Sequence, residues 1–331
     1  VQIVSKAVPS KTTMSILECI LVDTTNGEIK LTANDMELGI ETTIEGQIIE
    51  KGIIALDAKI FLEIVRKLPD SDITIETDAS FKTVITCEKA KFTIIGKSGE
   101  DFSYLPAVER DDSIVISQFT LKELVRQTIF SISDNDNNKL MTGELFDING
   151  DEFKIVSLDG HRISIRKIQM KNSYAPKKVV VPGKTLNEVS KILPGDADSD
   201  VTISFTEKHI VFEFDKTVVV SRLIEGEYFR IDQMLSSAYE TKVIVNKKEL
   251  LDCIDRATLL VKEGDKKPII MNITDGSMEL KINSFIGSMN EDIDIEKEGK
   301  DILIGFNPKF FIDALRVIDE ENVSLYMVNP K

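Results

Sequence analysis

A four-residue stretch near the middle of the chain, 159–162, carries the side chains best suited to acid–base chemistry. It reads Asp-Gly-His-Arg, and His161 is one of two histidines among 331 residues. A histidine beside an acid and an arginine could serve as a general acid or base. No nucleophile, metal-ligand set or partner base completes a catalytic site. We therefore interpret the stretch as a turn after a strand, in which Gly160 supplies a positive φ and polar side chains line a surface groove.

No other motif in the sequence points to an enzyme. The second histidine, His209, lies in Glu-Lys-His-Ile-Val, most simply an exposed hairpin position. The chain has no Gly-rich phosphate loop, no CxxC or HExxH motif and no Gly-x-Ser-x-Gly elbow. We expect no catalytic residue, no cofactor and no metal site, and we keep a hydrolase centred on His161 as an alternative.

One segment occurs three times in the chain, at 58–69, 183–194 and 308–318. In each copy apolar residues recur at helical spacing, which is the buried stripe of an amphipathic helix. The opposite face repeats a pair of cations, and the first member of each pair follows the previous one by 125 residues: Lys59 and Arg66, Lys184 and Lys191, Lys309 and Arg316. Short apolar runs flank every copy, so each is predicted to be strand, helix, strand. A period of this size indicates tandem domains rather than a short-repeat solenoid.

A second helix belongs to each repeat. We predict a helix over 120–131 with Leu121, Leu124, Val125 and Thr128 facing inward, and with Lys122 and Arg126 on its polar face. The tripeptide Lys-Glu-Leu at 122–124 returns at 248–250, which places the equivalent helix in the third repeat. A polar loop at 133–139, including Asn135 and Lys139, and a turn at 264–267 are rich in turn-forming residues.

The expected fold is α+β: three tandem domains of two helices plus antiparallel sheets, over residues 1–112, 113–239 and 240–331. Comparison of the repeats suggests that the first lacks about a dozen N-terminal residues and the third roughly thirty C-terminal residues. We therefore expect domain I to be incomplete at its start and domain III at its end.

Charge and composition limit the functional classes. The net charge is −15, which argues against a protein that grips nucleic acid over its whole surface, but not against one basic inner surface. Five Tyr and no Trp give no support for base stacking. Widely spaced cations on helices suit contact with the phosphates of duplex DNA that does not depend on base sequence. Three separated cysteines read as buried thiols in a reducing compartment, and no apolar run is long enough to span a membrane.

Two motifs, together with the threefold repeat and the two helices per repeat, resemble the bacterial sliding clamp family, the β subunit of DNA polymerase III. The motifs are Leu-Asp-Gly-His-Arg-Ile at 158–163 and Gly-Phe-Asn at 305–307. The first departs from the family's Thr-Asp-Gly-His-Arg-Leu at both ends. A further departure is Tyr-Phe-Arg-Ile at 228–231, where the family usually reads Phe-Pro-x-Tyr, so Phe229 replaces a proline.

The resemblance implies a head-to-tail dimeric ring of clamp domains that encircles duplex DNA without sequence preference and tethers the replicative polymerase for processive synthesis. Helices would line the hole and sheets would form the outer wall. The residues implied to face DNA are Lys11, Lys59, Arg66, Lys122, Arg126, Asn135, Lys139, Lys184, Lys191, Lys309 and Arg316. The ring seam would place Phe92 of one copy against Leu259 and Leu260 of the other.

The resemblance also implies a pocket for a short peptide with a Gln near its start and Leu-Phe near its end. Its residues would be Met141, Leu158, Gly160, His161, Arg162, Ile163, Phe229, Met234, Asn307 and Phe310. Expected partners are the DNA polymerase III α subunit, the clamp loader and other clamp-motif proteins, in the cytoplasm at the nucleoid. The alternative from a different class is a repeat-built interaction scaffold that never contacts DNA.

Overall fold

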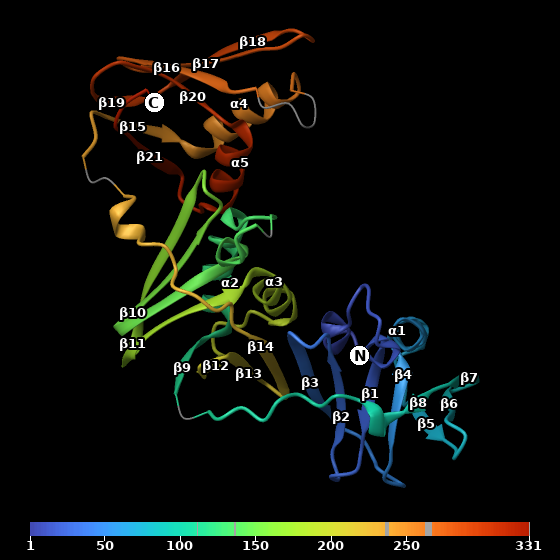
Figure 1. The fold of residues 1–331 in the computed structure, drawn as a ribbon. Coiled ribbons are helices and arrows are strands. Elements are labelled where there is room, and N and C mark those ends of the chain that lie inside the picture. Colours follow the sequence, from blue (N-terminus) through green and yellow to red (C-terminus); the bar gives the residue numbers. More distant parts are fainter. Residues whose placement is uncertain (111, 136, 236–237, 262–266, 331) are drawn as a thin grey trace. The chain divides into compact units, whose positions relative to one another are not determined.

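The computed structural model describes residues 1–110, 112–135, 137–235, 238–261 and 267–330 (Figure 1). Asp136 of the polar loop and residues 264–266 of the expected turn lie outside these ranges. The chain separates into two compact units, Val1–Gly226 and Glu227–Lys331, called unit 1 and unit 2 below. None of the helices in the described ranges is long and apolar enough to cross a membrane.

A nine-stranded antiparallel sheet joins the first two repeats in unit 1. Its strands are β1 (Cys19–Asp23), β2 (Ile29–Asn34), β3 (Leu38–Ile44), β4 (Ile53–Asp57), β8 (Lys97–Ser98), β9 (Ser113–Ser117), β12 (Asp200–Phe205), β13 (His209–Phe214) and β14 (Thr217–Arg222). They pair in the order β8-β4-β1-β2-β3-β14-β13-β12-β9. The link between repeats is β3 with β14, in a register from Thr42 opposite Thr217 to Leu38 opposite Ser221. The Thr42 and Thr217 hydroxyls lie 3.0 Å apart, which adds a buried side-chain hydrogen bond to the ladder.

Helix α1 (Ala58–Lys67) follows β4 directly, as the strand–helix–strand pattern predicts. Asp57 caps it, because its Oδ1 accepts a hydrogen bond from the Ile60 backbone N–H at 2.8 Å. Phe61 and Ile64 are buried in the core of unit 1. The helix ends before Leu68, which is extended because Pro69 follows it.

Helices α2 (Gln118–Arg126) and α3 (Gly183–Ile192) lie side by side (Figure 1). The four inward positions expected for α2 are all buried. The helix is shorter than the predicted 120–131, however, and resumes as a 3-10 helix at Ile129–Ser131. The Thr128 hydroxyl donates to the Leu124 carbonyl at 2.7 Å, a local side-chain bond that competes with regular helix.

Two smaller sheets complete unit 1. Strands β10 (Gly143–Leu158) and β11 (Ile163–Pro182) form a long ribbon, and β5 (Thr74–Thr77), β6 (Lys82–Cys87) and β7 (Ala90–Ile95) form a three-stranded sheet with β7 at an edge. Apolar residues at 144–148 and 153–158 predict two separate strands. They are one strand, because a bulge at 148–152 with Gly150 at φ +63° lets the chain continue. The sequence also predicts a strand over 16–22, which is wrong for residues 16–18, because they belong to a 3-10 helix and β1 begins at Cys19.

Short 3-10 helices occupy several connections, at Val4–Ala7, Ser15–Glu18, Gly99–Asp101, Lys139–Thr142 and Ile231–Gln233. Residues 1–8, followed by Pro9, predict the end of a helix, and the structure has the short 3-10 helix Val4–Ala7 there. The 3-10 helix Ser15–Glu18 directly precedes β1.

Unit 2 contains the third repeat. Its elements are β15 (Thr241–Asn246), α4 (Lys247–Thr258), β16 (Ile269–Thr274), β17 (Ser277–Asn283), β18 (Ser288–Asp294), β19 (Glu296–Gly299), β20 (Ile302–Phe306), α5 (Pro308–Val317) and β21 (Asn322–Met327). The sheets are β19-β15-β21 and β18-β17-β16-β20. Helices α4 and α5 lie side by side (Figure 1), and Leu250, Ile254 and Leu315 bury their apolar faces in one core.

Candidate functional site

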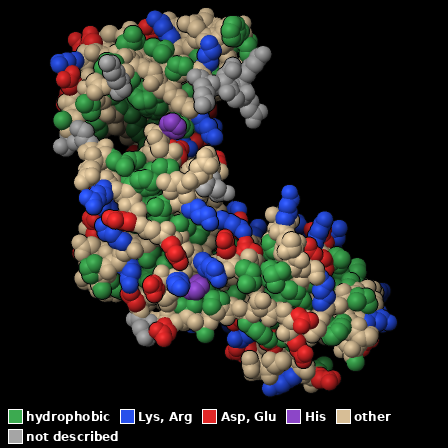
Figure 2. Space-filling model, viewed as in Figure 1, with side chains coloured by type: hydrophobic (Ala, Val, Ile, Leu, Met, Phe, Trp, Pro, Cys, Tyr) green, Lys and Arg blue, Asp and Glu red, His purple; other side chains and the backbone are tan. Residues whose placement is uncertain are grey.

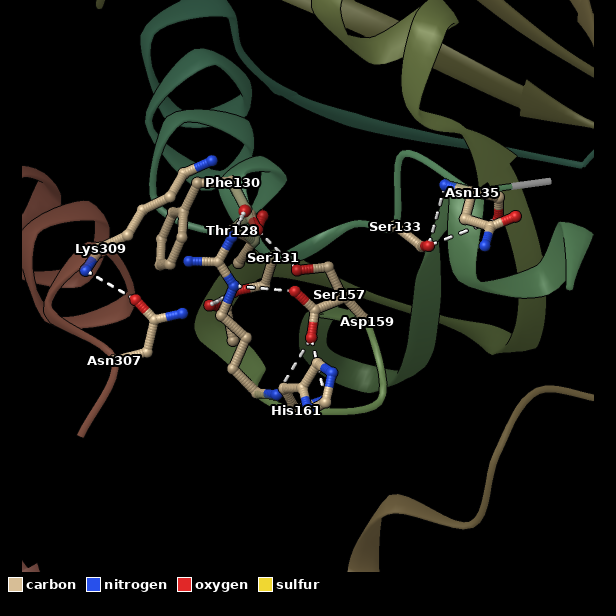
Figure 3. Close-up of polar contacts among 12 residues, drawn as sticks. Thr128, Phe130, Ser131, Ser133, Asn135, Ser157, Asp159, His161, Asn307 and Lys309 are labelled. Carbon is tan, nitrogen blue, oxygen red and sulfur yellow. Dashed lines mark hydrogen bonds and ion pairs between the residues drawn. The ribbon is translucent and has the colours of Figure 1, made fainter. Parts of the chain in front are cut away.

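The Asp159–Arg162 turn joins β10 to β11 (Figure 3). Gly160 has φ +87°, as the turn interpretation predicts. Asp159 Oδ1 accepts from the backbone N–H groups of His161 at 2.9 Å and Arg162 at 3.1 Å, while Oδ2 accepts from Arg162 Nε at 3.0 Å. Arg162 Nη2 also donates to the Phe130 carbonyl at 2.6 Å, and its guanidinium lies 5.4 Å from the Phe130 ring centroid. The turn is therefore fixed to the segment after α2, with His161 exposed on it.

A buried polar cluster lies among α2, β10 and β11. The Ser157 hydroxyl donates to the Thr128 carbonyl at 2.5 Å, and the Ser131 and Ser164 hydroxyls lie 2.6 Å apart (Figure 3). Glu144 of β10 is fully buried, and neither carboxylate oxygen accepts a hydrogen bond from a described residue. Burial raises the pKa of Glu144 to about 8, although the nearby Thr128 hydroxyl opposes this shift. Burial therefore favours the neutral, protonated form of the Glu144 carboxyl.

The unit 1 residues expected in the peptide pocket differ in exposure. Gly160 and His161 are exposed, whereas Arg162, Met141 and Ile163 are half-buried. Leu158 is 3% exposed and belongs to the interior beneath the turn. Residues 158 and 160–163 thus lie together where β10 connects to β11. Met141 lies on the 3-10 helix Lys139–Thr142, which precedes β10.

The unit 2 residues expected in that pocket lie on two separate elements. Asn307 caps α5, accepting from the Lys309 backbone N–H at 3.0 Å (Figure 3), and Phe310 is half-buried in the first turn. Phe229 is half-buried against Tyr228, with ring centroids 5.5 Å apart, and Met234 is exposed after the 3-10 helix at 231–233. The structure places these residues within unit 2, and their pocket role stays a prediction.

The cations expected on α1 and α3 are exposed, and three of them pair with acids. Arg66 Nη1 lies 3.1 Å from Glu63 Oε1, and Lys191 Nζ lies 2.8 Å from Glu188 Oε1. Lys184 forms an ion pair with Asp35, which belongs to the β2–β3 connection of the first repeat. Lys59 is exposed near the start of α1.

The remaining cations and loop residues are more varied. On α2, Lys122 Nζ donates to the Leu193 carbonyl at 3.2 Å, and Arg126 pairs with Glu123 at 2.6 Å. Lys309 is exposed on α5, and Arg316 Nη2 lies 3.4 Å from Asp255 Oδ1 of α4. The loop residues Lys11, Asn135 and Lys139 are exposed. The Asn135 backbone N–H donates to the Ser133 hydroxyl at 3.1 Å (Figure 3).

The expected seam residues are partly exposed in their own units. Phe92 lies on the edge strand β7, which also carries the exposed Ile95. Leu259, just after α4, is 79% exposed, and Leu260 is half-buried. Large apolar side chains open to solvent on an edge strand and a helix end are typical of an association surface.

The sequence places Glu63 and Glu188 on the same helix faces as the cations, but we did not predict from it that they form ion pairs. Glu63 and Glu188 stand three residues before Arg66 and Lys191, a helical spacing that could have identified those pairs. Asp35 is 149 residues from Lys184, and no local pattern signals that pair.

Helices with exposed cationic faces recur in three repeats and are backed by antiparallel sheets, one of which continues from the first repeat into the second. These features define the DNA-clamp class of fold. Comparison with known proteins agrees over the whole chain. Family models for the DNA polymerase III β subunit match as the N-terminal domain at 1–106, the central domain at 115–229 and the C-terminal domain at 232–331.

Individual relatives give the same result. The chain is 33% identical over 330 residues to the beta sliding clamp of Staphylococcus epidermidis, covering 97% of this chain and 87% of that one. Among solved structures, it is similar to a DNA polymerase III beta subunit from Eubacterium rectale, with 79% identity, a TM-score of 0.97, and coverage of 99% and 90% of the two chains. The DNA polymerase sliding clamp of Bacillus subtilis matches with 33% identity, a TM-score of 0.95, and coverage of 99% and 89%.

The chain belongs to the family of the bacterial DNA polymerase III β subunit, the β sliding clamps. The expected three tandem clamp domains are confirmed. Clamps of this family encircle DNA, work with DNA polymerase in replication and act as non-catalytic processivity factors. The hydrolase and the scaffold without DNA contact are therefore set aside.

Proposed function

We propose that two copies of this chain close head to tail into a ring, with β18 of one copy pairing with β7 of the other. The observation that carries this proposal is the β3–β14 ladder inside unit 1. The meander β1-β2-β3 precedes β4 and α1, as β16-β17-β18 precedes β20 and α5. Likewise β12-β13-β14 follows α3, as β5-β6-β7 follows α1. A contact equivalent to β3–β14 would thus join β18 to β7 of a second copy.

Both strands lie at sheet edges, and apolar side chains accompany them. β7 ends the order β5-β6-β7, and β18 begins the order β18-β17-β16-β20. Phe92 lies on β7. Leu260 lies close to the start of β18, because a Cβ added to Gly287, the residue before β18, would be 3.9 Å from Leu260 Cδ2. Because the two surfaces differ, the contact is heterologous, and two copies related by a twofold axis make it twice.

Cysteine cross-linking tests this arrangement. The variants Phe92→Cys and Leu259→Cys should each stay monomeric on a non-reducing gel, and their mixture should give a disulfide-linked dimer. The three native cysteines are buried and do not compete. A matched pair of exposed positions, Tyr104→Cys and Leu303→Cys, should give no specific dimer. Dimers of either single variant alone would contradict the head-to-tail contact.

The cationic residues of α1, α2, α3 and α5, with Lys11, Asn135 and Lys139, are proposed to face the encircled duplex. Exposed Lys and Arg side chains on helices contact phosphates without reading bases. The whole chain has 56 Asp and Glu against 41 Lys and Arg, a net charge of −15. This acidic excess disfavours DNA binding on surfaces outside the cationic helices.

The residues grouped at the Asp159–Arg162 turn, with those of unit 2 named above, are proposed to bind the clamp-motif peptide of partner proteins, including the polymerase α subunit and the clamp loader. The fixed turn and the adaptable methionines Met141 and Met234 support a site that accepts several peptides. His161→Ala should weaken binding of a labelled Gln…Leu-Phe peptide, whereas His209→Ala, in the half-buried position on β13, should not. Equal effects would contradict the site.

The domain limits 1–112, 113–239 and 240–331, and a cytoplasmic location at the nucleoid, belong to the same proposal. Limited proteolysis should cut near the two domain limits first.

A further inference from the structure

Acidic side chains accompany the proposed DNA-facing cations at equivalent places in the repeats. On α1, Glu63 lies one helical turn before Arg66, with an N–O distance of 3.1 Å. On α3, Glu188 lies one turn before Lys191, with a distance of 2.8 Å. The two pairs occupy matching positions of the first and second repeats, so the arrangement is repeated along with the cations themselves.

Two further cations receive an acid from another element. Asp35 directs Oδ1 to the backbone N–H groups of Glu37 and Leu38, at 3.0 and 2.7 Å, and Oδ2 to Lys184. Its side chain is only 8% exposed, so the carboxylate is fixed in place before it meets the lysine. In unit 2, Asp255 of α4 lies 3.4 Å from Arg316 of α5.

These pairs are weak enough to exchange. The Arg66–Glu63 and Arg316–Asp255 pairs are exposed on both sides, and such pairs contribute about 0–1 kcal/mol because water and salt screen them. In the Lys184–Asp35 and Lys191–Glu188 pairs the acid is largely buried and the lysine is the exposed partner. The four cations are more than half exposed, so a phosphate can reach each one. Figure 2 likewise shows Lys and Arg side chains interspersed with Asp and Glu over the face in view. A phosphate must therefore compete with a neighbouring carboxylate for each cation.

We propose that Asp35, Glu63, Glu188 and Asp255, called the partner carboxylates, limit the affinity of the channel for DNA so that the ring slides. This inference rests on the proposed function. With the partner carboxylates present, each cation exchanges between two anions and releases few counterions from DNA. Without them, each cation is free to neutralise a phosphate fully.

The test is a quadruple variant, Asp35→Asn, Glu63→Gln, Glu188→Gln and Asp255→Asn, in the full chain. Asparagine at 35 retains the oxygen that accepts from the two backbone N–H groups. Binding to a short labelled linear duplex is measured between about 50 and 200 mM salt. Each cation that gains a phosphate should steepen the log–log salt slope by about 0.9, which is about 3.5-fold in affinity over that range. Four such gains amount to roughly 150-fold.

A matched control removes the same charge away from the proposed channel. It is Glu152→Gln, Glu213→Gln, Glu240→Gln and Glu298→Gln, four carboxylates that pair with Lys167, Arg110, Lys300 and Lys242. The control should bind DNA with the wild-type slope. If the two quadruple variants steepen the slope equally, bulk charge explains the effect and the proposal is wrong. It is equally wrong if neither variant changes the slope.

A single-site variant and a loading experiment with the wild-type protein complete the test. If the quadruple variant unfolds at a lower temperature than wild type, Glu63→Gln alone is measured, because the Glu63 side chain is 46% exposed. A change in the salt slope of less than about 0.45, half of the value expected for one cation, would overturn the proposal. The wild-type ring is also loaded on circular DNA and the circle is cut. Retention of wild type after cutting would refute the proposed function itself, whereas loss with unchanged variant slopes refutes only the role of the partner carboxylates.

Discussion

Glu144 gives the sharpest prediction about stability. Its carboxylate is fully buried on β10, and neither oxygen is within hydrogen-bonding geometry of a described donor. The pKa of Glu144 is raised by burial from 4.5 to about 8. We predict that Glu144→Gln is more resistant to unfolding than wild type at alkaline pH, because glutamine never has to ionise.

Proton linkage gives the direction and the size of the effect of Glu144 on the free energy of unfolding. The folded chain holds the Glu144 proton up to about pH 8, while the unfolded chain releases it near 4.5. The stabilisation by this proton is complete below the unfolded pKa and is lost as the pH rises towards the folded pKa. At about 1.36 kcal/mol for each unit of pKa, the full penalty at high pH is on the order of 5 kcal/mol. It is about 3 kcal/mol at pH 7 and about 1 kcal/mol at pH 5.

Urea unfolding from pH 5 to 8 measures this difference. The free energy of unfolding of Glu144→Gln minus that of wild type should rise by about 2.5 kcal/mol between pH 5 and 7. Packing of the glutamine amide adds a pH-independent difference in the free energy of unfolding, so only the change of the difference with pH is compared. The control Glu152→Gln, a partly exposed carboxylate on the same strand, should show no such rise. A pH-independent difference for Glu144→Gln would refute the account of its burial.

Three further predictions concern single positions. Asp57→Ala removes the α1 cap and should lower the free energy of unfolding by about 1 kcal/mol in a urea titration, with an unchanged value arguing against the cap. Gly160→Ala places a Cβ in open space but at φ +87°, so it should destabilise the turn by about 1 kcal/mol and weaken peptide binding, which calorimetry would measure. The pKa of the Cys253 thiol is raised to about 12 by burial, so iodoacetamide should modify Cys253 only after unfolding; rapid native labelling, read by mass spectrometry, would contradict this.

Local patterns predicted the helices well. The apolar stripe of 58–69 predicts α1, since helical spacing puts Phe61 and Ile64 on the same face of a helix. Pro69 predicts where this helix ends. The positive φ at Gly160 followed from residue type and its position after a strand. These features depend on neighbours within a few residues.

Long-range and irregular features could not be predicted. β11 spans Ile163–Pro182, yet its polar and apolar positions do not alternate strictly. The sequence therefore predicts only its last part, the apolar run at 179–181 that precedes the second copy of the repeated helix. The Lys184–Asp35 pair depends on the β3–β14 ladder, which brings two repeats together. The burial of Glu144 also contradicts its residue type, because charged residues are rarely buried without a partner.

The central claim is that the chain encircles DNA and is held by topology rather than affinity. The most direct measurement follows labelled protein loaded by a clamp loader on nicked circular DNA, before and after one restriction cut. The account predicts retention on the intact circle at moderate salt and rapid loss from the cut DNA. Equal retention on circle and linear DNA, falling steeply with salt, would contradict it.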